Sequence, residues 1–158
     1  MRHFVLFGSH DLTLDEKNRV LCPADVRKKL DPERDGEAFF LVTGRDGRLW
    51  LYPERYYEQL VSRDPSELTP SEDSLAYDRI NLGMASRVEW DRQGRMLLPD
   101  SALKRVGITK GSEVTLVGVR DHLELWLRSD WDAERDRIEA RRTDVIEKVR
   151  QAKQNPPQ

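Results

Sequence analysis

The sequence predicts an α+β fold that is mainly β and contains a duplicated unit. One stretch occurs twice, at residues 15–30 and 91–106, with an offset of 76 residues. The two copies share five identities: Asp15/Asp91, Arg19/Arg95, Leu21/Leu97, Pro23/Pro99 and Lys28/Lys104. Around both copies, short apolar runs are separated by turn residues, which is typical of β-strands and hairpins. A repeat at one fixed offset indicates a tandem duplication, so we expect two half-domains of the same kind.

Each copy is expected to form a strand, a turn, a second strand and a short helix. Leu12 and Leu14 alternate with polar residues before the first turn, which is the period of a half-buried strand. Asn18 in the first turn and Gly94 in the second are residue types that tolerate a positive φ. A proline closes each apolar triplet and suits the start of a helix, because its missing N–H leaves no hydrogen bond unmade there.

Each motif is followed by a predicted hairpin and then by a helix. The first hairpin consists of residues 39–43 and 49–52, with a helix over 53–60. The second consists of residues 114–118 and 123–127, with a helix that begins at Ser129 and is capped by its side chain. Cys22 aligns with Leu98 inside an apolar triplet, so it is expected in the core.

These patterns divide the chain into four parts. We expect a first repeat at 8–60, a linker and helix at 61–85, a second repeat at 86–131, and a polar C-terminal helix with a frayed tail at 132–158. The linker starts with a polar, proline-containing loop. Its helix is expected to begin near Ser71 and to carry Ala76, Ile80, Gly83 and Met84 on one face. The C-terminal helix has only a thin apolar stripe, so it should be exposed or lean on a partner chain.

Composition argues against several protein classes. Of the 158 residues, 37% are hydrophobic and 35% are charged, which is a low apolar content for a compact globule. No apolar run reaches the length of a membrane span, and the first residues lack the pattern of a signal peptide. A single cysteine offers no disulfide framework. We therefore expect a cytoplasmic protein without a membrane partner.

The distribution of charge along the chain favours nucleic-acid binding, although the net charge does not. The net charge is −2, but residues 1–30 carry six Lys or Arg against four Asp or Glu, and residues 86–111 carry six against three. Residues 53–80 carry three against seven. Positive charge therefore accompanies the two motifs, which is compatible with a basic face for DNA.

The residues present disfavour an enzyme. His3, His10 and His122 are scattered and are expected on the surface, and no set of Cys, His and Asp has metal-ligand spacing. Gly44 and Gly47 belong to a hairpin turn and not to a phosphate-binding loop. Neither a catalytic site, a cofactor nor a metal is expected.

The paired Asp and Arg residues of the motif allow two interpretations. Asp15 with Arg19, and Asp91 with Arg95, could form salt bridges that only brace a tight turn. Alternatively, each turn presents its arginine outward, where a guanidinium can donate two hydrogen bonds to guanine in the major groove. Spacing alone does not separate the two interpretations.

The motif resembles that of the MraZ family, bacterial proteins related to the AbrB/SpoVT regulators. The family pattern is Asp-x-Lys-Gly-Arg-apolar-x-apolar-Pro in the first repeat and Asp-x-x-Gly-Arg-apolar-x-apolar-Pro in the second. Residues 15–23 and 91–99 match both patterns, except that Asn18 replaces the first glycine. Phe7-Gly8 and Leu51-Tyr52-Pro53 are similar to two further family features, and the similarity covers roughly residues 5–135.

The resemblance implies a fold and a function. The fold would be two tandem swapped-hairpin, AbrB-like half-domains that form one double-barrel core with peripheral helices. The protein would regulate transcription of the cell-division and cell-wall gene cluster, including its own promoter. It would bind tandem short repeats in double-stranded DNA as a ring-shaped homo-oligomer on the nucleoid. The implied DNA-binding residues are Lys17, Arg19, Arg92 and Arg95, with Asp15 and Asp91 bracing the turns, and Lys17 and Arg92 are expected to contact phosphate.

Two other functions stay open. The antitoxin of a toxin–antitoxin pair would also use swapped hairpins, although typically in one copy and with a disordered toxin-binding tail. Copurification of a small toxin would support that function. An enzyme with an unrecognised site would need a catalytic cluster, which the sequence lacks.

Overall fold

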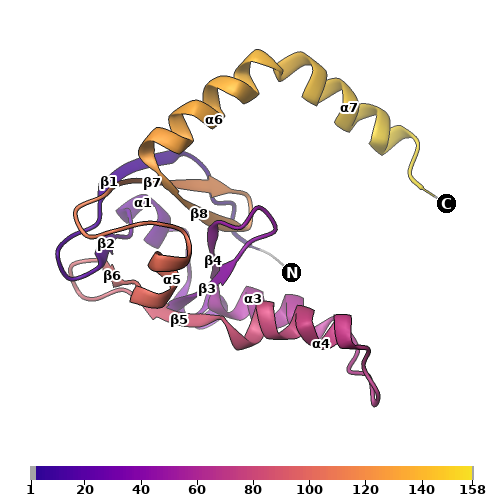
Figure 1. The fold of residues 1–158 in the computed structure, drawn as a ribbon, viewed down its shortest axis with the longest axis horizontal. Helices are drawn as coiled ribbons and strands as arrows, with labels where there is room; N and C mark the ends of the chain where they lie inside the picture. The colour runs from indigo at the N-terminus through magenta and orange to yellow at the C-terminus, as the bar shows by residue number, and fades with distance from the viewer. Residues whose placement is uncertain (1–2, 158) are drawn as a thin grey trace. The chain divides into compact units, whose positions relative to one another are not determined.

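The β-strands pair in one six-stranded sheet and one two-stranded ribbon (Figure 1). The computed structural model describes residues 3–157; Met1, Arg2 and Gln158, the end of the expected tail, lie outside them. The strands are β1 (Ser9–Thr13), β2 (Arg19–Leu21), β3 (Ala38–Thr43), β4 (Leu49–Pro53), β5 (Ser86–Glu89), β6 (Arg95–Leu97), β7 (Glu113–Val119) and β8 (His122–Leu127). The sheet order is β1-β7-β8-β4-β3-β5, and β2 pairs with β6. The prediction of a mixed fold with mostly β-structure is confirmed.

Strand pairing crosses between the two repeats. The predicted hairpins are confirmed, because β3 pairs with β4 and β7 pairs with β8. The other strands of each repeat pair with the opposite repeat: β1 with β7, β5 with β3, and β2 with β6. All of these pairs are antiparallel. The two strands that flank an Asp/Arg turn therefore form no ladder with each other, apart from a single bridge between Trp90 and Met96 at the second turn. Each repeat needs the other to complete its hydrogen bonding.

The ribbon relates the two repeats by a local twofold axis. Val20 lies opposite Met96, and these residues are 76 positions apart, like the motif copies. The neighbouring pairs are Arg19 with Leu97 and Leu21 with Arg95, so exchanging the repeats reproduces the register. In the sheet, β4 and β8 likewise pair at Leu49 and Leu125, which are also 76 positions apart.

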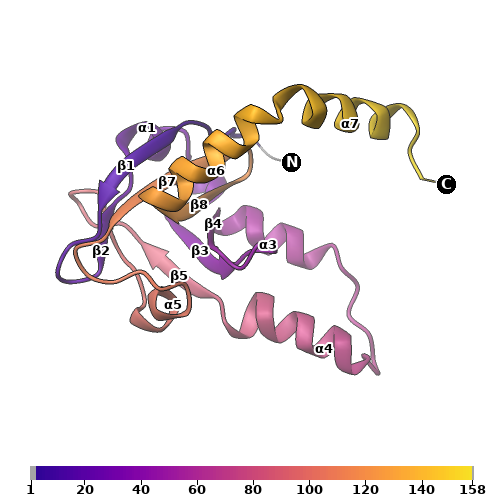
Figure 2. The ribbon, with the colours of Figure 1, turned by 45° about the horizontal axis from the view of Figure 1, so that its top comes forward.

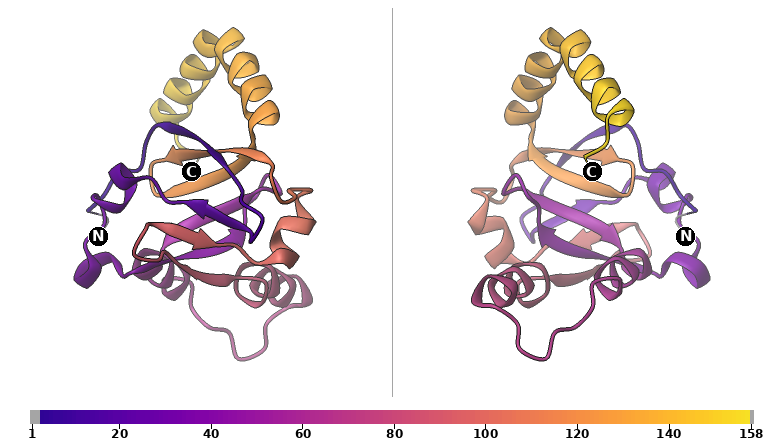
Figure 3. Two further views of the ribbon diagram at one scale, coloured as in Figure 1. Left: turned by 90° about the vertical axis from the view of Figure 1, so that its left-hand side faces the viewer. Right: turned by 90° about the vertical axis from the view of Figure 1, so that its right-hand side faces the viewer.

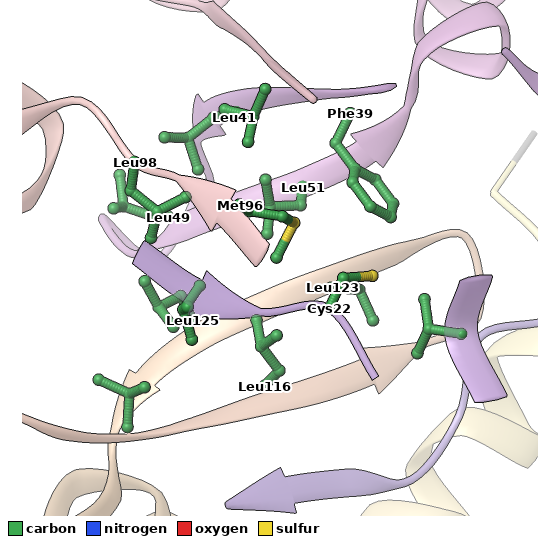
Figure 4. Packing of buried hydrophobic residues seen from close by; sticks show 14 of the residues in the cluster. Cys22, Phe39, Leu41, Leu49, Leu51, Met96, Leu98, Leu116, Leu123 and Leu125 are labelled. Atoms are coloured by element: carbon green, nitrogen blue, oxygen red, sulfur yellow. The ribbon is translucent and has the colours of Figure 1, made fainter. Parts of the chain in front are cut away.

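The core forms where side chains of the ribbon meet those of the sheet (Figure 4). Cys22 and Met96 lie between two groups of buried side chains, Phe39, Leu41, Leu49 and Leu51 in one group and Leu116, Leu123 and Leu125 in the other. Fully burying one such leucine contributes about 1.5–3 kcal/mol. Burial raises the pKa of the Cys22 thiol to about 12, so this thiol stays protonated and packs as a small hydrophobic side chain, as predicted.

Short helices follow both motifs. The helix α1 (Ala24–Arg27) begins directly after Pro23, and α5 (Asp100–Arg105) begins directly after Pro99. In the left view of Figure 3, α1 and α5 lie on opposite sides of the part of the structure that precedes Arg128. Two further helices belong to the first half: α2 (Pro32–Asp35), capped by Asp31, and α3 (Glu54–Ser62), which follows β4.

The linker helix begins as predicted but ends differently. Ser71 caps α4 (Glu72–Asp78), because its hydroxyl oxygen accepts a hydrogen bond from the N–H of Ser74. The chain then widens into a π-helical turn, η1 (Arg79–Gly83). The predicted helix is therefore present, but as α4 followed by a π-helical turn and not as one regular α-helix. The side chains of Ile80 and Met84 are both exposed.

Residues Arg128–Gln158 form a second compact unit, separate from Met1–Leu127. It contains α6 (Arg128–Ala140) and α7 (Arg142–Gln154). The two helices are separated by Arg141, where φ is −111° and ψ is 12°. The prediction of one continuous helix is wrong, and Ser129 lies inside α6 instead of capping it. Apolar side chains of this unit are exposed at Ile138, Ile146 and Val149. Within residues 3–157, no helix is both long and apolar enough to span a bilayer.

The expectation that the histidines lie on the surface is wrong for His122. Its imidazole is buried and stacks on Trp50, with 4.0 Å between the ring centroids. Nδ1 lies 2.7 Å from the carboxylate of Asp121, and Nε2 lies 3.3 Å from that of Glu124. Burial alone would lower the pKa of His122, but the hydrogen bonds to Glu124 and Asp121 outweigh it and raise the pKa above its ordinary value.

Candidate functional site

One carboxylate organises the first motif turn. Oδ1 of Asp15 accepts hydrogen bonds from the backbone N–H of Lys17 at 2.9 Å and of Arg19 at 2.8 Å. Oδ2 accepts a third, from Nε of Arg19, at 2.7 Å. Asn18 has a φ of 60°, a left-handed conformation that asparagine adopts more readily than most residues. The aspartate therefore braces the backbone and aims the arginine side chain at the same time.

The second turn repeats this arrangement. Oδ1 of Asp91 accepts from the backbone N–H of Gln93 and of Arg95, both at 2.9 Å. Oδ2 accepts from Nε of Arg95, also at 2.9 Å, and Gly94 has a φ of 82°. Hydrogen bonds from the backbone and side chain of Arg95 hold the pKa of Asp91 below its ordinary value. At Asp15, desolvation is the largest single effect and would raise the pKa, but the hydrogen bonds from Arg19 and Lys17 together outweigh it and lower the pKa.

The ribbon fixes the distance between the two turns. The N–H of Cys22 donates to the carbonyl of Gly94 at 2.7 Å, and the N–H of Leu98 donates to the carbonyl of Asn18 at 2.9 Å. Each turn therefore adjoins the end of the opposite strand. With a rise of about 3.3 Å per residue, Asn18 and Cys22 are about 13 Å apart along the ribbon. That spacing is similar to the width of the DNA major groove, about 12 Å. Both turns lie at the left of Figure 2.

The outward side of the ribbon combines basic and apolar residues. Val20 and Met96 are buried, so their neighbours along the strands point outward. The exposed fraction is 42% for Leu21 and 62% for Leu97. The side chains of Arg19 and Arg95 are 27% and 35% exposed. Each arginine lies opposite a leucine of the other strand, so the two guanidinium groups occupy diagonal positions.

Arg27 is a candidate residue that the repeat pattern did not indicate. Its guanidinium packs on the second turn, since a Cβ added at Gly94 would lie 2.8 Å from Cζ of Arg27. Its Nε donates to the carbonyl of Cys22 at 3.1 Å. The aligned position in the second repeat is Leu103, which is buried. The alignment alone would therefore have placed residue 27 in the core. The only available signal was its place in the cluster of Lys and Arg from 27 to 29.

The first turn has a different neighbour. Nδ2 of Asn18 donates a long hydrogen bond of 3.5 Å to Asp100 at the start of α5. Asp100 also pairs with Nζ of Lys104 at 2.9 Å. The hydrogen bond to Lys104 is the largest cause that holds the pKa of Asp100 below its ordinary value. Lys17 and Arg92, the expected phosphate contacts, lie at the exposed tips of the two turns.

The arrangement is suited to binding anions and base edges. A guanidinium carries five N–H donors, and the bond to aspartate uses one of them at Arg19 and one at Arg95. The aspartate also limits the rotamers of each arginine, which reduces the entropy lost when the side chain binds. Among the described residues, no group of three His, Cys, Asp or Glu side chains is placed to hold a metal ion.

Comparison with known proteins identifies similar sequences. The profile of a family described as "MraZ protein, putative antitoxin-like" matches residues 5–77 and 82–152. A protein named Transcriptional regulator MraZ from Moorella thermoacetica is 32% identical over 128 residues, which cover 81% of the chain and 85% of that protein. Proteins of the same name from Clostridium tetani and Carboxydothermus hydrogenoformans are 29% and 28% identical. These matches cover 84% and 92% of the chain, and 88% and 96% of those proteins. The name denotes a role in the regulation of transcription.

Proposed function

The chain belongs to the MraZ family, and we propose that it is a sequence-specific, DNA-binding transcriptional regulator without catalytic activity. The observation that carries this proposal is the outward side of the ribbon, where Arg19 and Arg95 are each held by an aspartate. A two-stranded ribbon fits the major groove, and arginine is the usual partner of guanine there. The structural and functional interpretations of the Asp/Arg pair are thus compatible, because one carboxylate bond serves both.

We assign a role to each residue of the two turns. Arg19 and Arg95 contact base edges, and Asp15 and Asp91 hold them in position. Lys17 and Arg92 at the tips neutralise phosphates, which fixes the register of the protein on the duplex without reading sequence. Leu21 and Leu97 lie next to the arginines and can contact thymine methyl groups.

The finer features of the fold follow the family resemblance. We propose that the two repeats, at 8–60 and 86–131, are swapped-hairpin half-domains of one double-barrel core. The cross-repeat pairing of β1, β2, β5 and β6 supports this assignment. The segments 61–85 and 132–158 would serve as linker and peripheral helix region, outside the DNA-binding part.

We also propose the partner and the assembly that the resemblance implies. The partner would be double-stranded DNA with tandem short repeats, in the promoter of the cell-division and cell-wall cluster that includes the gene of this chain. The protein would act on the cytoplasmic nucleoid as a ring-shaped homo-oligomer. One ribbon offers few base contacts, and linking several ribbons on one body raises avidity by about 10²–10⁴. Exposed apolar side chains on α4, η1 and α7 support contacts between copies.

Neutralisation of a toxin is the second candidate function. The observation that favours it is the description of the matching family as putative antitoxin-like, although α7 is helical and an antitoxin typically binds its toxin with a disordered tail. A small protein that copurifies with the chain and whose activity the chain suppresses would support this function.

A gel-shift experiment tests the main proposal. The probe is the duplex upstream of the gene that encodes the chain, with and without excess unrelated duplex. Arg19→Ala and Arg95→Ala should each weaken the specific shift. Arg150→Ala, which removes the same charge from an exposed position of α7, serves as the matched control and should leave the shift unchanged. Equal binding by all four proteins would exclude DNA recognition by the ribbon.

A further inference from the structure

The two turns have nearly the same backbone but different charges at their tips. Glu16 and Lys17 follow the aspartate of the first turn, whereas Arg92 and Gln93 occupy the aligned positions of the second. All four side chains are exposed. The tip of the first turn therefore combines one acid with one base, and the tip of the second carries a single, unopposed base.

The helix beside each turn increases this difference. At the second turn the neighbour is Arg27, whose hydrogen-bond acceptor is the neutral carbonyl of Cys22. Within residues 3–157, no carboxylate is paired with Arg27 or Arg92. At the first turn the neighbour is Asp100, which faces Asn18 and neutralises Lys104 across a 2.9 Å ion pair.

The charged groups around each turn can be compared directly. The first turn has three bases and two acids besides its Asp/Arg pair: Lys17, Lys104 and Lys110 with Glu16 and Asp100. Lys110 belongs to this group because its charge acts on Asp100. The second turn has Arg27 and Arg92, and no carboxylate in residues 3–157 is ion-paired with either of them, although Asp25 lies two residues before Arg27 in α1. A carboxylate near the DNA backbone repels phosphate, so the second turn offers the stronger attraction to a phosphate strand.

Building on the DNA-binding function proposed above, we propose that the second turn is the main phosphate anchor and the first turn the weaker one. The ribbon then binds DNA in one preferred orientation, although its backbone is close to twofold symmetric. A symmetric reader would suit inverted half-sites, because protein symmetry mirrors operator symmetry. A ribbon whose two turns differ in charge instead suits directly repeated sites, since every ribbon along the DNA must then have the same orientation.

A double charge exchange tests this inference. Glu16→Arg combined with Arg92→Glu moves the local charge from the second turn to the first and leaves the net charge at −2. Arg19→Ala and Arg95→Ala are then each measured in the natural background and in the exchanged background. The probe is a fluorescein-labelled duplex from upstream of the gene, titrated at several salt concentrations.

In the natural background, Arg95→Ala should weaken binding more than Arg19→Ala, and in the exchanged background this order should reverse. One lost phosphate contact lowers the log–log salt slope by about 0.9, which is roughly a three- to fourfold change in affinity between 50 and 200 mM salt. A loss of that size is expected for Arg92→Gln, which removes such a phosphate contact at the second turn. Thermal unfolding of each variant confirms that the comparison is made between folded proteins.

A second comparison avoids the bracing arginines. Arg92→Gln and Lys17→Gln each remove one positive charge from an exposed tip and leave both Asp/Arg pairs intact. Arg92→Gln should reduce affinity and salt slope more than Lys17→Gln. Equal losses here, or the same order of Arg19→Ala and Arg95→Ala in both backgrounds, would overturn the inference while DNA binding by the ribbon stands. If no variant weakens binding, the proposed function itself fails.

Discussion

Val20 and Met96 lie directly opposite each other at the centre of the ribbon, and they occupy equivalent positions of the two repeats. Both side chains are buried, with exposed fractions of 1% and 0%. This pair aligns the two strands so that Arg19 and Arg95 are brought to the same outward side. The core contact and the candidate site are therefore two sides of the same short ribbon.

Shortening the buried side of this pair should destabilise the protein strongly. Met96→Ala removes a fully buried side chain and leaves a cavity, which typically costs about 2–5 kcal/mol. Leu97→Ala is the matched control, because the neighbouring side chain is mostly exposed and should change stability by less than about 0.5 kcal/mol. Urea unfolding measures both values. A similar loss from both variants would show that the ribbon does not pack on the core as described.

Removal of a guanidinium from the outward side should affect binding more than folding. Arg19→Ala should weaken specific DNA binding by about 1–3 kcal/mol if the side chain contacts a base. Fluorescence anisotropy against the upstream duplex measures this loss, and Arg150→Ala is the control for removal of one positive charge. If Arg19→Ala instead lowers stability and leaves binding per folded molecule intact, the aspartate–arginine pair is only a brace.

Neutralising the bracing aspartates should separate affinity from specificity. Asp15→Asn keeps the shape of the side chain but removes the charge that holds Nε of Arg19. Binding to unrelated duplex should rise slightly, because a negative charge is lost near phosphate. Binding to the specific duplex should fall, because the arginine is no longer held. Asp144→Asn, at an exposed site of α7, should leave the ratio of the two affinities unchanged.

Substituting two glycines that share the same φ separates the cost of backbone strain from the cost of crowding. Gly47 and Gly94 both have a φ of 82°, which a side chain disfavours by about 1–2 kcal/mol. A Cβ at Gly47 would meet open space, whereas a Cβ at Gly94 would press on the guanidinium of Arg27. Gly94→Ala should therefore cost more than Gly47→Ala in thermal unfolding. It should also weaken DNA binding by displacing Arg27, which Gly47→Ala should not do.

The buried histidine predicts a loss of stability as the pH rises. The folded-state pKa of His122 is raised, so its contribution is fully present below the unfolded pKa, about 6.5. It is lost as the pH rises through the folded pKa, because a neutral imidazole no longer pairs with Asp121 and Glu124. Arg48, which lies over Trp126, also acts on Glu124 and stays charged over this range. The difference in unfolding free energy between the natural protein and His122→Gln should shrink between pH 6 and pH 9. A constant difference would contradict the pairing.

The two turns and the two hairpins were accessible from the sequence because their determinants are local. Asp15 and Arg19 are four residues apart, and Asn18 or Gly94 permits the positive φ that closes each turn. The hairpins β3–β4 and β7–β8 join neighbouring runs through short loops. The helix start at Ser71 was predictable for the same reason, since a capping side chain reaches only three residues ahead.

The sequence by itself determined the repeat, its turns and the residue types at the candidate site. Only the tertiary structure decided that β2 pairs with β6, that Arg27 packs on the second turn, and that His122 is buried. Each of these depends on segments far apart in the chain. A short strand such as β2 has hydrogen-bonding groups that any other edge could satisfy, and shared burial of Val20 and Met96 selects the partner. Local preference therefore specifies the turns, and long-range packing specifies where they meet.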